Sequence, residues 1–275
     1  MKILCIYHGS CADGFTSAWI VNKCHPGTEF HAGYYSELPP DVTDKYVFIV
    51  DFSYKLEIMK EIVDKAFHVV HIDHHDTAIK DMNDYDDEMN LEKIYSPHNT
   101  ESGAMLTWKY FYPELEVPDI IKHVDDRDRW KFKIPGTREI SANMFSYDYT
   151  FENWDMLMNQ RLDQQIAEGT AIERRMAKDT KELIGVVVRR MNIAGYNVPI
   201  ANVTYQYGSD LCSEICKGEP FAGYYYDKPT HREFGLRSSP GAVHVGKIAQ
   251  MFGGGGHEHA SGFRRTFEEA KAFEL

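Results

Sequence analysis

The chain has 275 residues, of which 43% are hydrophobic, and its formal net charge at pH 7 is -12. This length suits one or two domains with a sizeable core, and two is the better estimate. The negative charge argues against tight, non-specific binding of long duplex nucleic acid, because such binding depends on many lysine and arginine contacts to phosphate.

Hydropathy and cysteine usage indicate the cellular compartment in which the protein is expected. No stretch reaches the roughly 18 uninterrupted apolar residues of a membrane helix, and the first residues read as a strand rather than a secretion signal. The five cysteines are irregularly spaced and include no C-x-x-C pair, so neither a disulfide framework nor a zinc knuckle is expected. We therefore expect a cytoplasmic protein that does not associate with membranes.

The spacing of hydrophobic residues predicts a parallel sheet in the first half of the chain. Short apolar runs, "KILCIY", "KYVFIVDF" and "FHVVHID", alternate with helix-like stretches at 14–23 and 56–65. This alternation is typical of parallel strands joined by crossover helices. Ligands bind beyond the carboxyl ends of the strands in such sheets, and these strands end in His8, Asp51 and Asp73.

The rest of the sequence predicts further helices and a second α/β unit. Helices are expected at "SGAMLTWKYF", at "PDIIKHVDD" and, as one or two long helices, over 153–183. A β-hairpin turning at 194–197, a helix near 210–217 and strands at "FAGYYYD" and "REFGLRSS" follow. We expect a first domain, a helical linker and a smaller α/β domain, over residues 1–155, 156–185 and 186–275.

The segment "VVHIDHHDT" places three histidines and two aspartates at the end of an apolar run. Adjacent side chains on a strand point to opposite faces, so His74 and His75 can face one ligand only from a loop beyond the strand. Histidine and carboxylate together suit Mn²⁺, Zn²⁺ or Fe²⁺, and the aspartates favour the harder Mn²⁺. This segment alone leaves a metal site and a solvated turn equally open.

A carboxylate also closes the apolar run "YVFIVDFS". Asp51 needs a cation or a helix N-terminus there, because a buried, unpaired carboxylate is costly. The alternative is a cap on a helix starting near Tyr54. The first strand leads into a loop that His8 and Asp13 bracket. Three parallel strands thus bring histidines and aspartates to one edge, which favours a metal centre over three unrelated turns.

These segments resemble the motifs of the DHH phosphoesterases, which include RecJ exonucleases, nano-RNases, cyclic-di-AMP phosphodiesterases and manganese pyrophosphatases. "DHH" at 73–75 resembles the motif that names the family, "ADGFTSA" the first motif, "IVDFS" the second and "DRDRWKF" the fourth. In the C-terminal part, "LRSS" and "IAQMFGGGGHEHASGF" resemble the accessory substrate-binding domain of the family (DHHA1). The resemblance implies an N-terminal DHH domain and a smaller C-terminal DHHA1 domain.

The resemblance also implies two divalent cations, with Mn²⁺ favoured and other divalent cations left open. By position, the ligands would be His8 on one side, Asp51 as the bridging carboxylate, and Asp13, His74 and Asp128 on the other. Asp126 is the alternative to Asp128, which is preferred because Phe132 follows it by four residues, as in nano-RNases. His75 would lie behind the ligands or near the scissile phosphate, and is expected to be catalytic together with Asp73.

One position departs from the family pattern. Cys11 stands where the first motif of the family has an aspartate, and His8 lies one place out of register. A thiolate is a softer ligand than a carboxylate. If Cys11 is a ligand, the metal position on the side of His8 is weakened, selects a softer ion, or uses a neighbouring carboxylate instead. It is equally open that Cys11 is a small buried thiol with no metal-binding role.

The C-terminal motifs predict contacts to substrate phosphate and base. Consecutive glycines permit positive φ and a close backbone approach, so their amides can bind a phosphate. Arginine and serine add charge-assisted contacts. The expected substrate-binding residues are Arg237, Ser238, Gly254, Gly255, Gly256 and His257.

We expect a phosphodiesterase in which metal ions activate a water and a short oligonucleotide, or a linear or cyclic dinucleotide, is held between the two domains. One alternative is a pyrophosphatase or polyphosphatase of the same family. Another is a nucleotide-binding sensor with weakened catalysis, which Cys11 keeps open. The sequence does not decide between RNA and DNA, nor whether the chain forms a homodimer.

Overall fold

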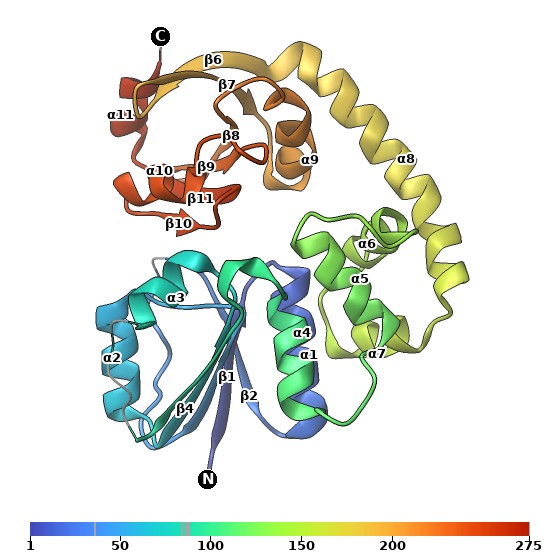
Figure 1. The fold of residues 1–275 in the computed structure, drawn as a ribbon, viewed down its shortest axis with the longest axis vertical. Coiled ribbons are helices and arrows are strands. Elements are labelled where there is room, and N and C mark those ends of the chain that lie inside the picture. The colour runs from blue at the N-terminus through green and yellow to red at the C-terminus, as the bar shows by residue number, and fades with distance from the viewer. Residues whose placement is uncertain (36, 84, 86–88, 275) are drawn as a thin grey trace. The chain divides into compact units, whose positions relative to one another are not determined.

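The computed structural model describes residues 1–35, 37–83, 85 and 89–274. It divides into two compact units, Met1–Glu173 and Arg174–Leu275. Each unit is built on a sheet of its own (Figure 1). None of the helices in the described ranges is both long enough and apolar enough to cross a membrane.

The first unit contains a five-stranded sheet in which all neighbouring strands are parallel. Its strands, in the spatial order β2-β1-β3-β4-β5, are β1 (Ile3–His8), β2 (Glu29–Gly33), β3 (Tyr46–Val50), β4 (His68–Asp73) and β5 (Leu91–Tyr95). Its helices are α1 (Ala12–Cys24), α2 (Leu56–Lys65), α3 (Asp76–Asn83), α4 (Gly103–Phe111), α5 (Asp119–Asp128), α6 (Thr137–Phe145) and α7 (Phe151–Asn159), with a short 3₁₀ turn at Pro97–Asn99.

Helices cover both faces of this sheet (Figure 1). Ile6 and Ile49 pack with α2 on one face, and Cys5 and Phe48 pack with α1 and α4 on the other. Alternate residues of a strand point to opposite faces, so strands covered on both sides are apolar throughout. This double burial explains why β1, β3 and β4 are readable in the sequence as continuous apolar runs.

The sequence did not predict β2 and β5, which are the two edge strands of the sheet. Edge strands have a neighbour on one side only, and most residues of β2 and β5 are partly exposed. Their sequences, "EFHAG" and "LEKIY", mix charged and apolar residues and lack a continuous apolar run. The apolar pattern therefore marks only the interior of the sheet.

The second unit has a six-stranded sheet in the order β10-β11-β9-β8-β7-β6, antiparallel except for the parallel pair β7 and β8. Its elements are β6 (Val188–Ile193), β7 (Tyr196–Asn202), α9 (Tyr205–Ile215), β8 (Ala222–Asp227), β9 (Arg232–Arg237), α10 (Val245–Met251), β10 (Gly255–Gly256), β11 (Ala260–Arg265), α11 (Phe267–Ala270) and a 3₁₀ turn at Lys271–Phe273. The long helix α8 (Leu162–Val187) contains the division between the units.

The predicted β-hairpin joins β6 to β7. Ala194 and Gly195 have φ angles of 54° and 86°, and Ile193 pairs with Tyr196. Two central residues with positive φ form the turn whose twist suits a two-residue hairpin. The expected fold class, a parallel-sheet unit followed by a shorter α/β unit with a helical connection, is confirmed.

Candidate metal centre

The candidate ligands lie at the carboxyl edge of the first sheet. His8 and Asp73 are the last residues of β1 and β4, and Asp51 follows β3 directly. Because these strands are parallel neighbours, their ends meet at one edge. The first strand lies between β2 and β3, so the chain changes direction across the sheet at this point, which is where open α/β sheets bind ligands.

Asp51 turns the chain out of the sheet. Its φ is 54°, in the left-handed region that aspartate enters more readily than most residues, and its amide donates to Ile72 O at 2.8 Å. The side chain is 1% exposed. Its Oδ1 lies 3.1 Å from His74 Nε2, and its Oδ2 lies 3.4 Å from His8 Nδ1. The alternative role as a helix cap is wrong, because Lys55 occupies the N-cap of α2.

The N-terminus of α4 supports the carboxylates from a neighbouring helix. Asp13 Oδ1 accepts hydrogen bonds from Ser102 Oγ at 2.6 Å and from the amide of Ala104 at 3.1 Å. A Cβ placed on Gly103 would lie 2.5 Å from Asp51 Cβ, so only glycine permits this approach. Helix N-termini stabilise anions. Even so, burial and the charges of Asp51 and Asp128 raise the pKa of Asp13 well above its usual value.

His74 lies among three carboxylates. Its Nε2 is 3.1 Å from Asp51 Oδ1, 3.4 Å from Asp128 Oδ2 and 3.8 Å from Asp13 Oδ2. Its Nδ1 is 3.0 Å from Asn99 Oδ1, an acceptor that places the proton on Nδ1. Burial lowers the pKa of His74, but the hydrogen bond to Asp51 and the nearby carboxylates outweigh it and raise that pKa well above its usual value.

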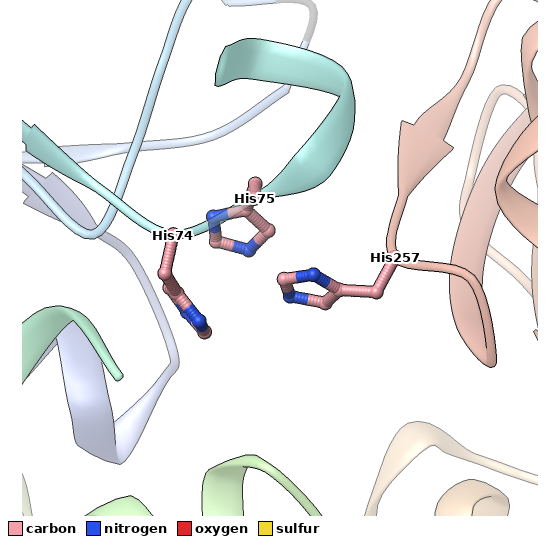
Figure 2. A group of neighbouring side chains, drawn as sticks. All are labelled: His74, His75 and His257. Carbon is pink, nitrogen blue, oxygen red and sulfur yellow. The ribbon is translucent and has the colours of Figure 1, made fainter. Parts of the chain in front are cut away.

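Asp73 orients the ring of His75 through a hydrogen bond to its Nδ1. Its Oδ1 accepts from His75 Nδ1 at 2.7 Å and from the amides of His74 and His75 at 2.7 and 3.2 Å. With the proton held on Nδ1, the lone pair of His75 is on Nε2. Both histidines leave the turn between β4 and α3 (Figure 2), as expected for a loop beyond the strand.

Among the described residues of the first unit, two groups have ligand atoms that lie within 4.8 Å of one another. One is His8, Asp51 and His75, and the other is Asp13, Asp51 and His74. Asp51 belongs to both. Among the described residues, Oδ2 of the buried Asp73 has no hydrogen-bond partner, and neither have three atoms of the two groups: Oδ2 of Asp13, Oδ2 of Asp51 and Nδ1 of His8. Buried polar atoms are normally paired, so these atoms fit divalent cations as their partners.

Cys11 belongs to neither of these groups. It occupies the N-cap of α1 without a capping hydrogen bond from its side chain. Loss of solvation and the charges of Asp51 and Asp128 raise the pKa of its thiol well above the usual value. In the metal-free chain these effects disfavour the thiolate, which is the form of cysteine that binds metals.

Asp126 and Asp128 have different surroundings although both lie in the last turn of α5. The carboxylate of Asp126 accepts from the amides of Lys133 and Ile134 at 2.9 and 3.0 Å and from Thr137 Oγ1 at 2.8 Å. Its oxygens hold the following loop, and its pKa is lowered because these bonds outweigh burial. Asp128 is the one that lies beside His74.

The second unit carries the expected substrate-binding residues. Arg237 ends β9 and donates to Ser209 Oγ at 2.8 Å and to Leu236 O at 2.7 Å. Ser238 is buried and its Oγ lies 3.0 Å from His259 Nδ1. His259 therefore supports the segment that contains Arg237.

The glycine run forms a strand and its lead-in rather than a linker. Gly255–Gly256 is β10, paired with β11, and a Cβ on Gly254 would lie 2.0 Å from Gly262 O. The amide of Gly254 donates to Ala249 O at the end of α10, so this glycine supplies a close backbone approach. His257 follows β10 (Figure 2), and its amide donates to Ala260 O at 2.7 Å.

Three residues of the site were missed in the sequence: Asn99, Ser102 and Gly103. All lie in "SPHNTESGA", the segment that leads from the end of β5 into the first turn of α4. The signal that identified the other ligands, polar residues just after a strand, applies here as well. It was overlooked because β5 itself was not predicted.

No protein-family model matches the chain. The uncharacterized protein R106 of Acanthamoeba polyphaga mimivirus is 29% identical over 288 residues, which cover 94% of this chain and 66% of that protein. The chain thus spans slightly less than two thirds of the length of this curated relative.

Among solved structures, the pGpG-specific phosphodiesterase PggH of Vibrio cholerae has a TM-score of 0.50 and 14% identity, covering 98% of this chain and 95% of that one. The chain has the fold of this phosphodiesterase. An exopolyphosphatase-related protein of Bacteroides fragilis is less similar, with a TM-score of 0.44 and 14% identity over 98% of this chain and 89% of that one.

Proposed function

We propose that this protein is a metal-dependent phosphodiesterase of the DHH type that hydrolyses short oligonucleotides or dinucleotides. The observation that carries the proposal is the position of Asp51. It is buried at the carboxyl edge of the sheet and belongs to both groups of potential ligands. A carboxylate shared in this way is suited to bridge two cations.

The proposed centre uses the residues that the motifs indicate. His8 and Asp51 would hold one cation, and Asp51, Asp13, His74 and Asp128 the other. Two divalent cations, Mn²⁺ in our proposal, would supply Lewis-acid activation of water and of the phosphoryl oxygens. The mixture of imidazole and carboxylate donors fits such ions.

The protein groups around the centre hold it in a fixed geometry. Asn99 and Asp73 orient His74 and His75 through their Nδ1 atoms. We assign Asp73 a positioning role, because Oδ1 of its buried carboxylate accepts from His75 Nδ1 and from two amides. Of the two residues expected to be catalytic, His75 is the one that Asp73 presents to the centre.

The second unit is proposed to bind the phosphate and base of the substrate. Arg237 is held by Ser209 and carries a charge that suits phosphate. Ser238, the glycines Gly254 to Gly256 and His257 complete the proposed set. A short substrate is favoured because the chain is acidic, which disfavours long polyanions.

A substrate panel with Mn²⁺ tests the proposal. It comprises pGpG, which the name of the structural neighbour suggests, longer oligoribonucleotides, cyclic dinucleotides, single-stranded DNA and pyrophosphate. Hydrolysis of a nucleotide by the native chain, absent in His74→Ala, is expected. Turnover of pyrophosphate alone would replace the proposal with a pyrophosphatase, and saturable binding without turnover would replace it with a sensor.

Two variants separate the roles of the units. Asp51→Ala should lower kcat by at least about 100-fold, since it removes the ligand common to both cations. Arg237→Ala should chiefly raise KM, by about 10-fold or more, because a charged contact to phosphate is lost. Steady-state kinetics on the best substrate of the panel measures both.

The exposed residues Asp64 and Arg174 offer charge-matched controls for these variants. Asp64→Ala and Arg174→Ala should leave both constants within about twofold of the native values. An equal loss of kcat in Asp51→Ala and Arg237→Ala would contradict the assignment of the chemistry to one unit and binding to the other.

A further inference from the structure

The two groups that share Asp51 offer different ligand atoms. His8 and His75 add two imidazole nitrogens to Asp51 in the first group. The second group adds Asp13 and His74, and Asp128 lies 3.4 Å from His74 Nε2. One position is therefore rich in nitrogen, and the other is rich in carboxylate oxygen.

His75 completes the first group together with His8 and Asp51. Cys11 replaces the aspartate of the family pattern and belongs to neither group. The ring of His75 lies 5.5 Å from that of His8, at 75° between the planes. The third member of the first group is thus an imidazole from the turn after β4.

Asp73 makes His75 a suitable ligand. Histidines that bind metals usually donate their second N–H to a carboxylate or a carbonyl, which fixes the tautomer and raises the basicity of the ligating nitrogen. The bond of 2.7 Å from His75 Nδ1 to the buried Asp73 has this arrangement. It leaves the lone pair on Nε2, so Nε2 is the nitrogen that would bind.

We propose that His75 is the third protein ligand of the first position, and that the two positions select different metals. The position of His8, Asp51 and His75 takes a borderline ion such as Zn²⁺ or Fe²⁺, which imidazole suits. The position of Asp13, Asp51, His74 and Asp128 takes Mn²⁺ or Mg²⁺, which carboxylates suit. The inference rests on the proposed centre of two cations but on no particular substrate.

Metal loading of the full chain tests this directly. Protein stripped by a chelator is given excess Mn²⁺, with or without one equivalent of Zn²⁺, and then dialysed. Metal content is measured by mass spectrometry, and the Mn²⁺ environment by electron paramagnetic resonance. With Mn²⁺ alone we expect two ions coupled through Asp51. With Zn²⁺ we expect one Zn²⁺ and one isolated Mn²⁺ per chain.

Variants assign the ions to the positions. His75→Ala should lower the metal affinity of the position of His8 and Asp51 by 10-fold or more. Added Zn²⁺ should then compete with Mn²⁺ for the position of Asp13, Asp51, His74 and Asp128. Asp128→Asn should weaken Mn²⁺ binding and leave the Zn²⁺ in place. His68→Ala, at the other end of β4, is the control and should bind both ions as the native chain does.

Two results would overturn the inference. One is His75→Ala with both ions at native affinity, and the other is native protein in which one equivalent of Zn²⁺ leaves the Mn²⁺ pair intact. If His75→Ala does not fold, Asp73→Asn takes its place, with an expected loss of about 10-fold at the nitrogen-rich position. The predicted metal pattern without hydrolysis of any substrate would instead overturn the proposed function alone.

Discussion

Single residues decide how closely the candidate ligands approach one another. Asp51 can point toward both His8 and His74 because its backbone has a positive φ. Gly103 allows the first turn of α4 to lie against that side chain. Strained or tightly packed residues of this kind persist where the surrounding structure requires them, often at functional sites.

Replacing Gly103 tests this packing. Gly103→Ala puts a Cβ 2.5 Å from Asp51 Cβ and 2.9 Å from its Oδ1, so either α4 or Asp51 must move. We expect a destabilisation of about 1–3 kcal/mol from overpacking. We also expect a loss of about 100-fold in kcat/KM, the usual effect of a displacement near 1 Å. Chemical denaturation and steady-state kinetics measure the two effects.

A second glycine provides the matched control. Gly185 lies within α8, and a Cβ there would meet nothing within 4 Å. Gly185→Ala should keep full activity and raise the free energy of unfolding by up to about 1 kcal/mol, because alanine favours a helix. Equal behaviour of the two variants would show that the contact between Gly103 and Asp51 is unimportant.

At the level of elements, the last turn of α5 contains two aspartates with different surroundings: one holds the loop that follows, and the other is a proposed metal ligand. Trp130 and Phe132 have φ angles of 56° and 49°, which are unfavourable for bulky residues. Asp126 holds this conformation by accepting from three donors of the loop and α6. Asp128, two residues later, is directed to the site.

The two aspartates should therefore respond differently to the same change. Asp126→Asn keeps one acceptor oxygen where three donors converge, so we expect a destabilisation of about 1–3 kcal/mol with little change in metal affinity. Asp128→Asn should lower metal affinity by about 10-fold or more and leave the stability of the metal-free chain nearly unchanged. Denaturant titration without metal and Mn²⁺ titration compare them. The reverse pattern would move the ligand role to Asp126.

The same level shows where sequence reasoning succeeds. The interior strands β1, β3 and β4 were predicted because both of their faces are buried. The edge strands β2 and β5 were missed because they are half exposed. Missing β5 also hid the segment after it, and with it Asn99, although that residue accepts the hydrogen bond from His74.

At the scale of the whole molecule, each unit has a hydrophobic core of its own. Leu4, Ile49 and Met59 belong to a core of the first unit, and Ile200 and Phe234 belong to the core of the second. The candidate ligands all come from the first unit. Binding of metal ions should therefore stabilise the first unit selectively.

Hydrogen exchange can test this selectivity. At a free Mn²⁺ concentration 100 times the Kd, one bound ion stabilises its unit by about 2.7 kcal/mol. Amides of β1 and β3 should then exchange about 100-fold more slowly than in a chelator, while those of β8 and β9 change little. The difference should vanish in His74→Ala. Equal protection of both sheets would mean that the units unfold together or that the ions bind elsewhere.

The sequence by itself determined the interior strands, the hairpin, and the presence of histidines and aspartates where strands end, because burial and turn geometry act on neighbouring residues. It also indicated the DHH resemblance through its motifs. Only the tertiary structure decided which of these groups meet: that Asp51 is shared by two ligand groups, that His75 joins His8, and that Cys11 does not. Such contacts depend on strand order and helix packing between residues far apart in the chain, which no local pattern of side chains specifies.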